Sequence, residues 1–66
     1  MRIIIDVRTD NAAFDGAGGP HEAARIIHEA ADAIAALETL PTAPDLIAAC
    51  RDYNGNTVGA VEFHDD

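Results

Sequence analysis

Hydrophobic and polar residues alternate along residues 2–9, near the start of the 66-residue chain. The odd positions are apolar and would share one face of a strand, since successive side chains of a strand point to opposite faces: Ile3, Ile5 and Val7. The even positions would form a largely solvated face: Ile4, Asp6 and Arg8. β-branched residues dominate the segment and favour extended backbone. We therefore predict a strand over 2–9.

A helical period replaces this alternation from Pro20 to Leu40. Apolar residues recur at spacings of three and four and would form one stripe: Ala23, Ile27, Ala30, Ile34 and Leu37, widened by Ile26, Ala33 and Leu40. Charged residues would occupy or border the opposite face: Glu22, Arg25, Glu29, Asp32 and Glu38. Pro20 suits the first helical position, whereas Pro41 cannot continue the hydrogen bonds of a helix. The pattern predicts one amphipathic helix of about five turns.

Turn-forming residues separate the predicted elements. Asp, Asn and Gly are frequent in DNAAFDGAGG, residues 10–19, which predicts a loop whose Phe14 folds back onto the core. Asn54 and Gly55 lie between two strand-like runs, which predicts a hairpin with positive φ at both residues. Gly59, in the second of these runs, predicts a bulge or the close approach of another backbone.

Together these elements predict an α+β fold in a single domain that spans residues 1–66. The order along the chain is β-α-β-β, and we expect a three-stranded sheet of antiparallel or mixed pairing. The last strand would lie in the centre, antiparallel to both others, with one long amphipathic helix on one face. A chain of this length buries only about 60% of the surface that its unfolded form exposes, which leaves no second layer to wall a catalytic cleft.

The acidic balance of the chain is its most unusual property. Twelve Asp and Glu stand against four Arg and no Lys, so the net charge is −8 at pH 7. Such a field repels nucleic acid and anionic membranes and favours basic surfaces on partners. We therefore expect a basic protein surface as the partner, with neither direct nucleic-acid contact nor membrane binding. Solubility of a small domain is the alternative reason for the charge.

Cysteine content and the N-terminal run bear on the compartment. Cys50 is the only cysteine, so no disulfide can form within the chain. We expect a buried structural thiol and a reducing compartment. The run MRIIIDV reaches Asp6 too early for a signal peptide or a membrane span. These features predict a cytoplasmic protein that is a monomer or a weak homodimer.

No residue pattern predicts catalysis, a metal site or a cofactor. A calcium loop beginning at Asp52 would need Gly at its sixth position, but Gly stands at the fourth, and Glu62 falls at the eleventh position rather than the twelfth. His21 and His28 would lie about 10 Å apart along a helix, too far for two ligands of one ion. The chain has no Ser, and its Gly-rich loop lacks the Lys of a phosphate-binding loop. We therefore expect neither an enzyme nor a bound cofactor.

Acidic residues of the predicted loop and helix could together form one partner-binding surface: Asp10, Asp15, Glu22, Glu29 and Asp32. Glu22 and Glu29 would be about 10 Å apart, and carboxylates one turn apart about 5–6 Å. Phosphates along a DNA strand have a similar spacing. The sequence therefore predicts a surface able to occupy a basic nucleic-acid channel. A solvated helix face without a partner is the alternative.

Two segments, TDNAAF (Thr9–Phe14) and RDYNGNTVG (Arg51–Gly59), together resemble a set of very short proteins encoded by phages and other bacterial mobile elements. Small acidic phage proteins include many anti-CRISPR inhibitors, several of which occupy DNA-binding surfaces of the interference complex. The resemblance implies this class of protein and the cytoplasm of a bacterial host as its setting, and it implies no catalytic residue. Together with the acidic charge it favours a basic Cas subunit of a type I surveillance complex as the partner. A second hypothesis is a phage or plasmid accessory module that pairs with another protein through its sheet or hairpin.

Overall fold

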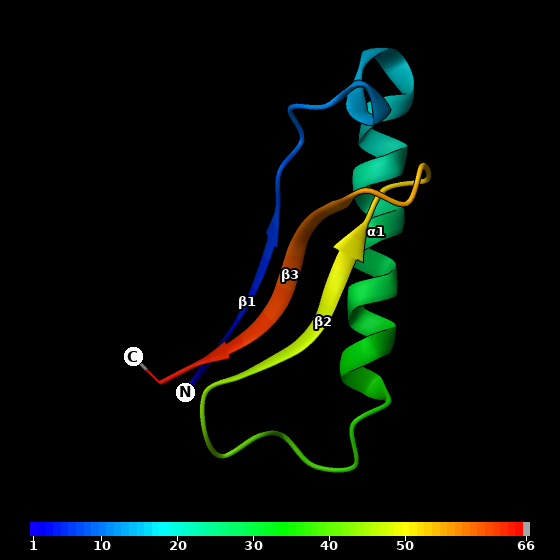
Figure 1. Ribbon diagram of the computed structural model, residues 1–66. Helices are drawn as coiled ribbons and strands as arrows, with labels where there is room; N and C mark the ends of the chain where they lie inside the picture. The colour runs from blue at the N-terminus through cyan, green and yellow to red at the C-terminus, as the bar shows by residue number, and fades with distance from the viewer. Residues whose placement is uncertain (66) are drawn as a thin grey trace.

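One sheet and one main helix make up the computed structural model, which describes residues 1–65 (Figure 1). The strands are β1 (Arg2–Val7), β2 (Asp45–Arg51) and β3 (Thr57–His64), and helix α1 spans Gly19–Ala35. Two short 3-10 helices precede α1, namely η1 (Ala12–Phe14) and η2 (Gly16–Gly18). β3 pairs antiparallel with β1 on one side and with β2 on the other, which gives the order β1-β3-β2. The predicted α+β class and strand order are confirmed.

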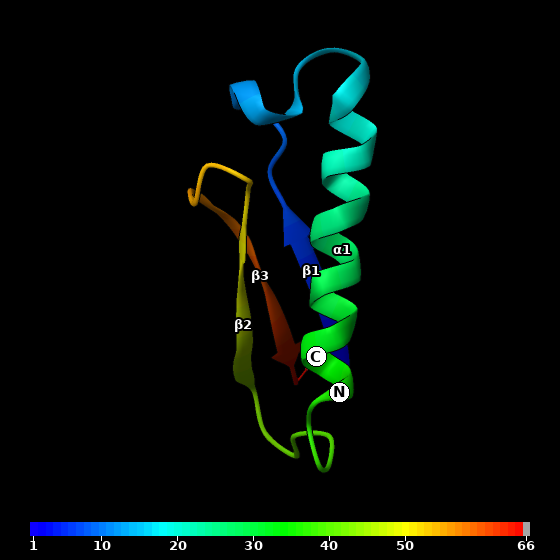
Figure 2. The ribbon, with the colours of Figure 1, turned by 90° about the vertical axis from the view of Figure 1, so that its right-hand side faces the viewer.

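α1 covers one face of the sheet (Figures 1 and 2). It packs more closely against β2 than against β1. The core between these layers is small, and its two fully buried large side chains are Ile26 and Val61. The residues of the core cluster are Ile26, Ala30, Cys50, Val58 and Val61, with Val7, Phe14, Ile34 and Ile47 packed against them. Phe14 therefore folds from its loop onto the core, as predicted.

β1 presents its odd-numbered residues to the helix side of the sheet, as the alternation predicts. Ile3 pairs with Phe63 and Ile5 with Val61, and directly paired residues point to the same face. Phe63 and Val61 are buried, yet Ile3 and Ile5 are 41% and 37% exposed. The difference arises because α1 leaves β1, at the edge of the sheet, only partly covered.

α1 ends at Ala35 rather than at the predicted Leu40. Its 17 residues span about 25 Å, which matches the roughly 27 Å of the eight-residue β3 that it lies beside. A helix that continued to Leu40 would extend beyond the sheet, where it would find no apolar surface to pack against. The buried stripe is centred on Ile26 and Ala30, whereas Ile27 is 49% exposed.

The hairpin between β2 and β3 forms as predicted, but its turn is different. The amide of Gly55 donates to the carbonyl of Asp52 at 3.0 Å, and the amide of Asp52 donates to the carbonyl of Asn56 at 2.9 Å. Gly55 has φ of 84°, whereas Asn54 does not have positive φ. The connection is therefore a three-residue loop that ends in a left-handed glycine, and not a two-residue turn with two left-handed residues.

Gly59 marks a close approach between β3 and β1, as predicted. A Cβ at this position would lie 1.7 Å from the carbonyl oxygen of Asp6, which belongs to the paired strand. Only glycine therefore allows the two backbones to pass so near to one another.

Candidate functional site

Asp52 is the centre of a polar cluster that joins the hairpin to the loop before α1. The residue is only 4% exposed. Its carboxylate accepts hydrogen bonds from the backbone amides of Asn54 and Asn56, both at 2.9 Å, and from the side-chain amide of Asn56 at 3.2 Å. Asn11 Nδ2 donates a further bond at 2.9 Å, across 41 residues of sequence. The two segments TDNAAF and RDYNGNTVG are therefore in direct contact, which gives both a structural role.

Glu22 is a second buried carboxylate, 8% exposed, and it joins α1 to the hairpin. Its two oxygens accept from Arg25 Nε at 2.7 Å and Nη2 at 2.9 Å, and Oε2 also accepts from the amide of Tyr53 at 2.7 Å. Arg25 in turn donates to the carbonyl of Arg51 at 3.2 Å and pairs with Glu29. The prediction that Glu22 lies on the exposed helix face is wrong, because its carboxylate is buried, pairs with Arg25 and accepts a hydrogen bond from the hairpin.

These hydrogen bonds favour the ionised form of both carboxylates. The guanidinium of Arg25 holds the pKa of Glu22 below its ordinary value of 4.5, although burial opposes this effect. Burial also opposes ionisation of Asp52, but the amide of Asn56 and the other N–H donors outweigh it and hold the pKa below 3.8. Both groups are therefore anionic at neutral pH, and their interactions depend on that charge.

Acidification is expected to destabilise the fold as the pH falls below about 4.5. A carboxylate with a depressed folded-state pKa contributes stability that is fully present above its unfolded-state pKa and is lost as the pH falls through the folded value, because the unfolded state binds more protons in that range. The urea midpoint should therefore decrease between about pH 5 and pH 2.5. We expect this decrease to be shallower in Glu22→Gln, measured by circular dichroism.

The matched control is Asp32→Asn, which removes the same charge from an exposed position on α1. Its midpoint should follow the pH dependence of the unmodified protein. If the profile of Glu22→Gln is as steep as that of Asp32→Asn, the depressed pKa of Glu22 does not stabilise the fold.

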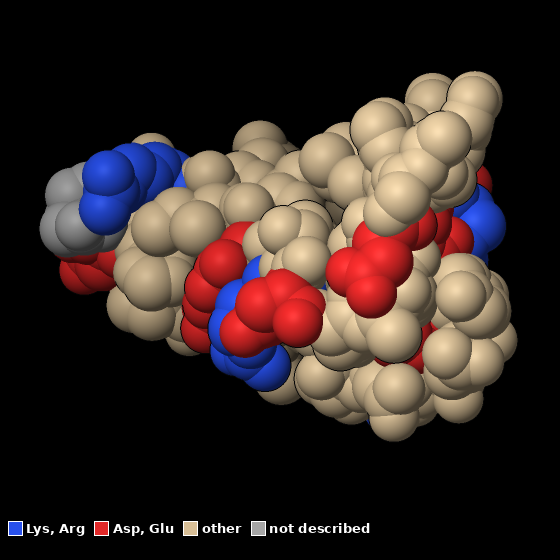
Figure 3. Space-filling view, turned by 90° about the horizontal axis from the view of Figure 1, so that it is seen from above, with Lys and Arg blue, Asp and Glu red and all other residues tan. Residues whose placement is uncertain are grey.

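The remaining predicted acidic residues come from two parts of the fold, the loop before α1 and α1 itself. Asp10 and Asp15 are exposed and flank η1, whereas Asp32 is exposed near the C-terminal end of α1. Glu29 is exposed too, but it is paired with Arg25. Viewed from the end that carries the loops, Asp and Glu side chains gather in separate groups, with Arg side chains and uncharged residues between them (Figure 3). The structure thus divides the predicted surface into a loop part and a helix part.

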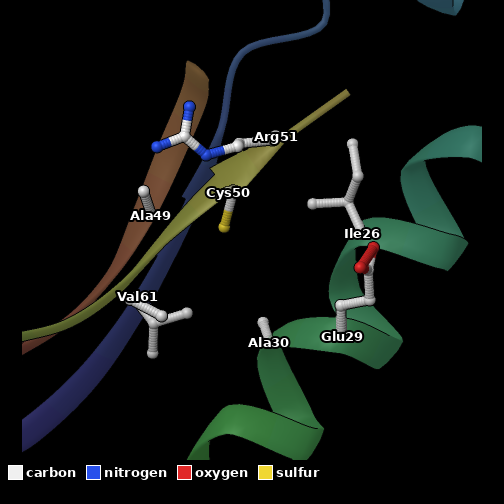
Figure 4. A pocket seen from close by; sticks show the side chains of 8 residues that line it. Ile26, Glu29, Ala30, Ala49, Cys50, Arg51 and Val61 are labelled. Carbon is white, nitrogen blue, oxygen red and sulfur yellow. The ribbon is translucent and has the colours of Figure 1, made fainter. Parts of the chain in front are cut away.

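Cys50 lines a hollow of about 140 Å³ between α1 and β2. Its side chain points toward Ile26 and Ala30, while the Arg51 side chain points away from the helix (Figure 4). Burial, together with the negative charges of Asp6 and Glu29, raises the pKa of the thiol. The prediction of a buried structural thiol is confirmed, and the environment favours the neutral thiol over the nucleophilic thiolate.

The described residues also bear on metal binding and on membrane insertion. The oxygens of Asp52 face N–H donors, so hydrogen bonds of the protein itself organise the hairpin. Residues 1–65 contain no group of three His, Cys, Asp or Glu side chains that could hold a metal ion. The same part of the chain contains no helix that is both long enough and apolar enough to cross a membrane.

Sequence reasoning missed the polar cluster, although one signal for it exists. Asp52 is followed two and four positions later by Asn, with Gly between them. This spacing is typical of a side chain that bonds the backbone of its own turn. Asp52 and Asn56 therefore organise the turn, a role that the rejected calcium loop did not suggest. The contact with Asn11 left no comparable signal, because it depends on how the two loops meet in space.

The surface that the described residues present to a partner consists of exposed charges and exposed apolar side chains. The two buried carboxylates are engaged by N–H donors of the protein itself, and the Cys50 environment favours the neutral thiol. No protein-family model, curated protein or solved structure matches the chain.

Proposed function

We propose that the protein is a non-enzymatic inhibitor of phage or mobile-element origin, whose acidic surface binds the basic nucleic-acid-binding face of a bacterial protein complex. In concrete terms the partner is a type I CRISPR surveillance complex in the host cytoplasm, and the acidic surface excludes its DNA. The observation that carries the proposal is the excess of exposed negative charge. Eight acidic residues are exposed against four Arg: Asp6, Asp10, Asp15, Glu29, Asp32, Glu38, Asp45 and Asp65.

We assign the contact to the predicted acidic residues that are exposed. Asp10, Asp15 and Asp32 are exposed and lie on the predicted loop and helix, and Glu29 adds a charge that it shares with Arg25. Glu22 serves a different purpose, since it fixes Arg25 against the hairpin. A charged surface of this kind steers association with a basic partner, and its affinity depends on the salt concentration.

Reversal of three of these charges tests the proposal. In Asp10→Lys/Asp15→Lys/Asp32→Lys, we expect the apparent affinity for a purified type I complex to fall by about tenfold or more, because attraction to its Arg and Lys side chains becomes repulsion. The measurement is competition with target DNA in an electrophoretic mobility assay. The control is Glu38→Lys/Asp45→Lys/Asp65→Lys, which changes the net charge equally but lies outside the predicted contact.

Three results would argue against the proposal, two of them from the competition assay. One is that the unmodified protein, present well above the concentration of the complex, does not reduce target-DNA binding by any type I complex. The other is an equal loss of affinity in both triple variants, since that would indicate a dependence on net charge alone. Inhibition that does not weaken between low and high salt would also contradict an electrostatic contact.

A second candidate is an accessory module that pairs with another protein through its sheet. The partly exposed Ile3 and Ile5 on the edge strand β1 favour it. Contacts of this kind are apolar and backbone-mediated, so binding would persist at high salt and would be lost on substitution of β1 rather than of the acidic residues.

A further inference from the structure

β1 is a regular, open edge of the sheet. Its six residues pair with six consecutive residues of β3 without interruption, and within residues 1–65 no strand lies on its other side. The opposite edge, β2, is irregular, with register shifts between Leu46 and Ala48 and between Cys50 and Arg51. Irregularities of this kind hinder pairing with another strand, whereas a regular edge invites it. β1 is therefore the edge that can accept a further strand.

The backbone of β1 directs alternate residues toward that open side. The amide of Arg8 donates to the carbonyl of Val58 at 2.8 Å, so position 8 faces β3. Residues of an antiparallel pair alternate between bonding to the partner and pointing away from it. The N–H and C=O groups of Ile3 and Ile5 consequently point outward, ready to bond with another strand.

The sequence of β1 is complementary to itself in one antiparallel register. When Ile4 lies opposite Ile4 of a second copy, Arg2 lies opposite Asp6, and Ile3 lies opposite Ile5. The outward N–H and C=O groups of Ile3 and Ile5 then meet one another, as an antiparallel ladder requires. Two cross-strand ion pairs would form on the uncovered face of the sheet, and isoleucine pairs on the helix side.

The neighbouring registers are less favourable. A shift by two positions in one direction places Arg2 opposite Arg8 and Ile4 opposite Asp6. A shift in the other direction places Arg2 opposite Ile4 and removes the contact of Arg2 with Asp6. Like charges directly opposite one another destabilise a strand pair, whereas opposite charges stabilise it. Charge therefore selects the register centred on Ile4.

The exposed surface is consistent with a partner at this edge. The accessible surface is 4402 Å², whereas a folded chain of 6.9 kDa typically has about 4,000 Å². The excess of roughly 400 Å² is about half of what each partner buries in an interface of standard size. Ile27 lies on the flank of α1 opposite to Glu29 and adds apolar surface on the helix side. A weak association that covers Ile3 and Ile5 would reduce this excess.

We infer that two copies of this chain associate through β1, in the register centred on Ile4, to form one antiparallel six-stranded sheet with both α1 helices on the same face. A two-fold axis perpendicular to the sheet passes between the two Ile4 residues. The interface is isologous, since each chain gives Arg2 to the Asp6 of the other. The inference does not rest on the proposed function, whose contact residues Asp10, Asp15 and Asp32 lie outside β1.

Sedimentation velocity over a range from micromolar to millimolar protein tests this inference. The unmodified chain should show a reversible monomer–dimer equilibrium. Arg2→Asp and Asp6→Arg should each raise the dissociation constant about tenfold, because each places like charges opposite one another at two symmetric positions. The double variant Arg2→Asp/Asp6→Arg restores opposite charges and should return the dissociation constant to within about threefold of the original value.

Mixing the two single variants separates association from folding. An Arg2→Asp chain and an Asp6→Arg chain present complementary charges to one another, so the equimolar mixture should contain heterodimer at concentrations where neither variant alone associates. A monomer at every concentration overturns the inference, as does a dimer that the single variants leave unchanged. Single variants that weaken the dimer without recovery on mixing overturn the register. If the protein stays monomeric but binds the edge strand of an unrelated protein, β1 has another occupant, and the inference is likewise overturned.

Discussion

Replacement of Gly59 by alanine is expected to remove a large part of the stability of the fold. The added Cβ would lie 1.7 Å from the carbonyl oxygen of Asp6 and 3.1 Å from Cα of Val7. Both atoms belong to the backbone of β1, so no side-chain rotation relieves the contact, and β1 would have to separate from β3. Overpacking costs about 1–3 kcal/mol even where neighbours can yield, and a domain of this length has a total stability of roughly 3–10 kcal/mol. We expect a loss of about 3 kcal/mol or more, measured by urea denaturation.

Gly18→Ala is the matched control. A Cβ at Gly18 meets no atom within 4 Å, and the residue has φ of −79°, which alanine adopts without strain. Its free energy of unfolding should stay within about 0.5 kcal/mol of the original. Equal urea midpoints for the two variants would show that β1 and β3 can adjust, and that the close approach at Gly59 is not required for pairing.

Asp52→Ala is the second substitution from which we expect a large effect. The carboxylate accepts four hydrogen bonds and is almost fully buried, so its removal leaves donors of Asn11, Asn54 and Asn56 without this acceptor. Hydrogen bonds to an ionised acceptor contribute more to stability than neutral ones, so the loss of four of them is costly even though Asn54 and Asn56 are exposed to water. We expect the melting temperature to fall by about 10 °C or more, in thermal unfolding followed by circular dichroism.

The control for this substitution is Asp15→Ala, because Asp15 is exposed and its side chain does not bond the first turn of η2. It should melt close to the unmodified protein. A double-mutant cycle between Asn11→Ala and Asp52→Ala then isolates the contact that joins the two loops. Additive effects in that cycle would mean that Asp52 acts only within its own turn.

Much of the fold could be predicted from local patterns. The alternation over residues 2–9 correctly places Ile3 and Ile5 on the helix side of the sheet, and Asn54 with Gly55 correctly locates the hairpin. Gly59 correctly marks a close approach of two backbones. Each of these features depends on the period of a strand or on the limits of a single residue, which are properties of short segments.

The features that could not be predicted depend on contacts between distant segments. Helical periodicity places Glu22 at the margin of the apolar stripe, where a charged residue is normally exposed. Its burial requires Arg25 on the same helix and the amide of Tyr53 from the hairpin, 31 residues away. The end of α1 at Ala35 is likewise set by the length of the sheet beside it, and not by the sequence of the helix alone. The division of the predicted acidic surface into a loop part and a helix part likewise depends on how distant segments are arranged in space.

The buried position of Cys50 gives the protein a built-in probe of its own opening. Because the thiol lies between β2 and α1 and is the only one in the chain, a thiol-specific reagent reaches it when these two elements separate. The labelling rate at low reagent concentration therefore reports the fraction of molecules in which the helix has lifted from the sheet. Compared with the free energy of unfolding from urea denaturation, the labelling rate would distinguish a substitution that loosens the helix from one that unfolds the whole chain.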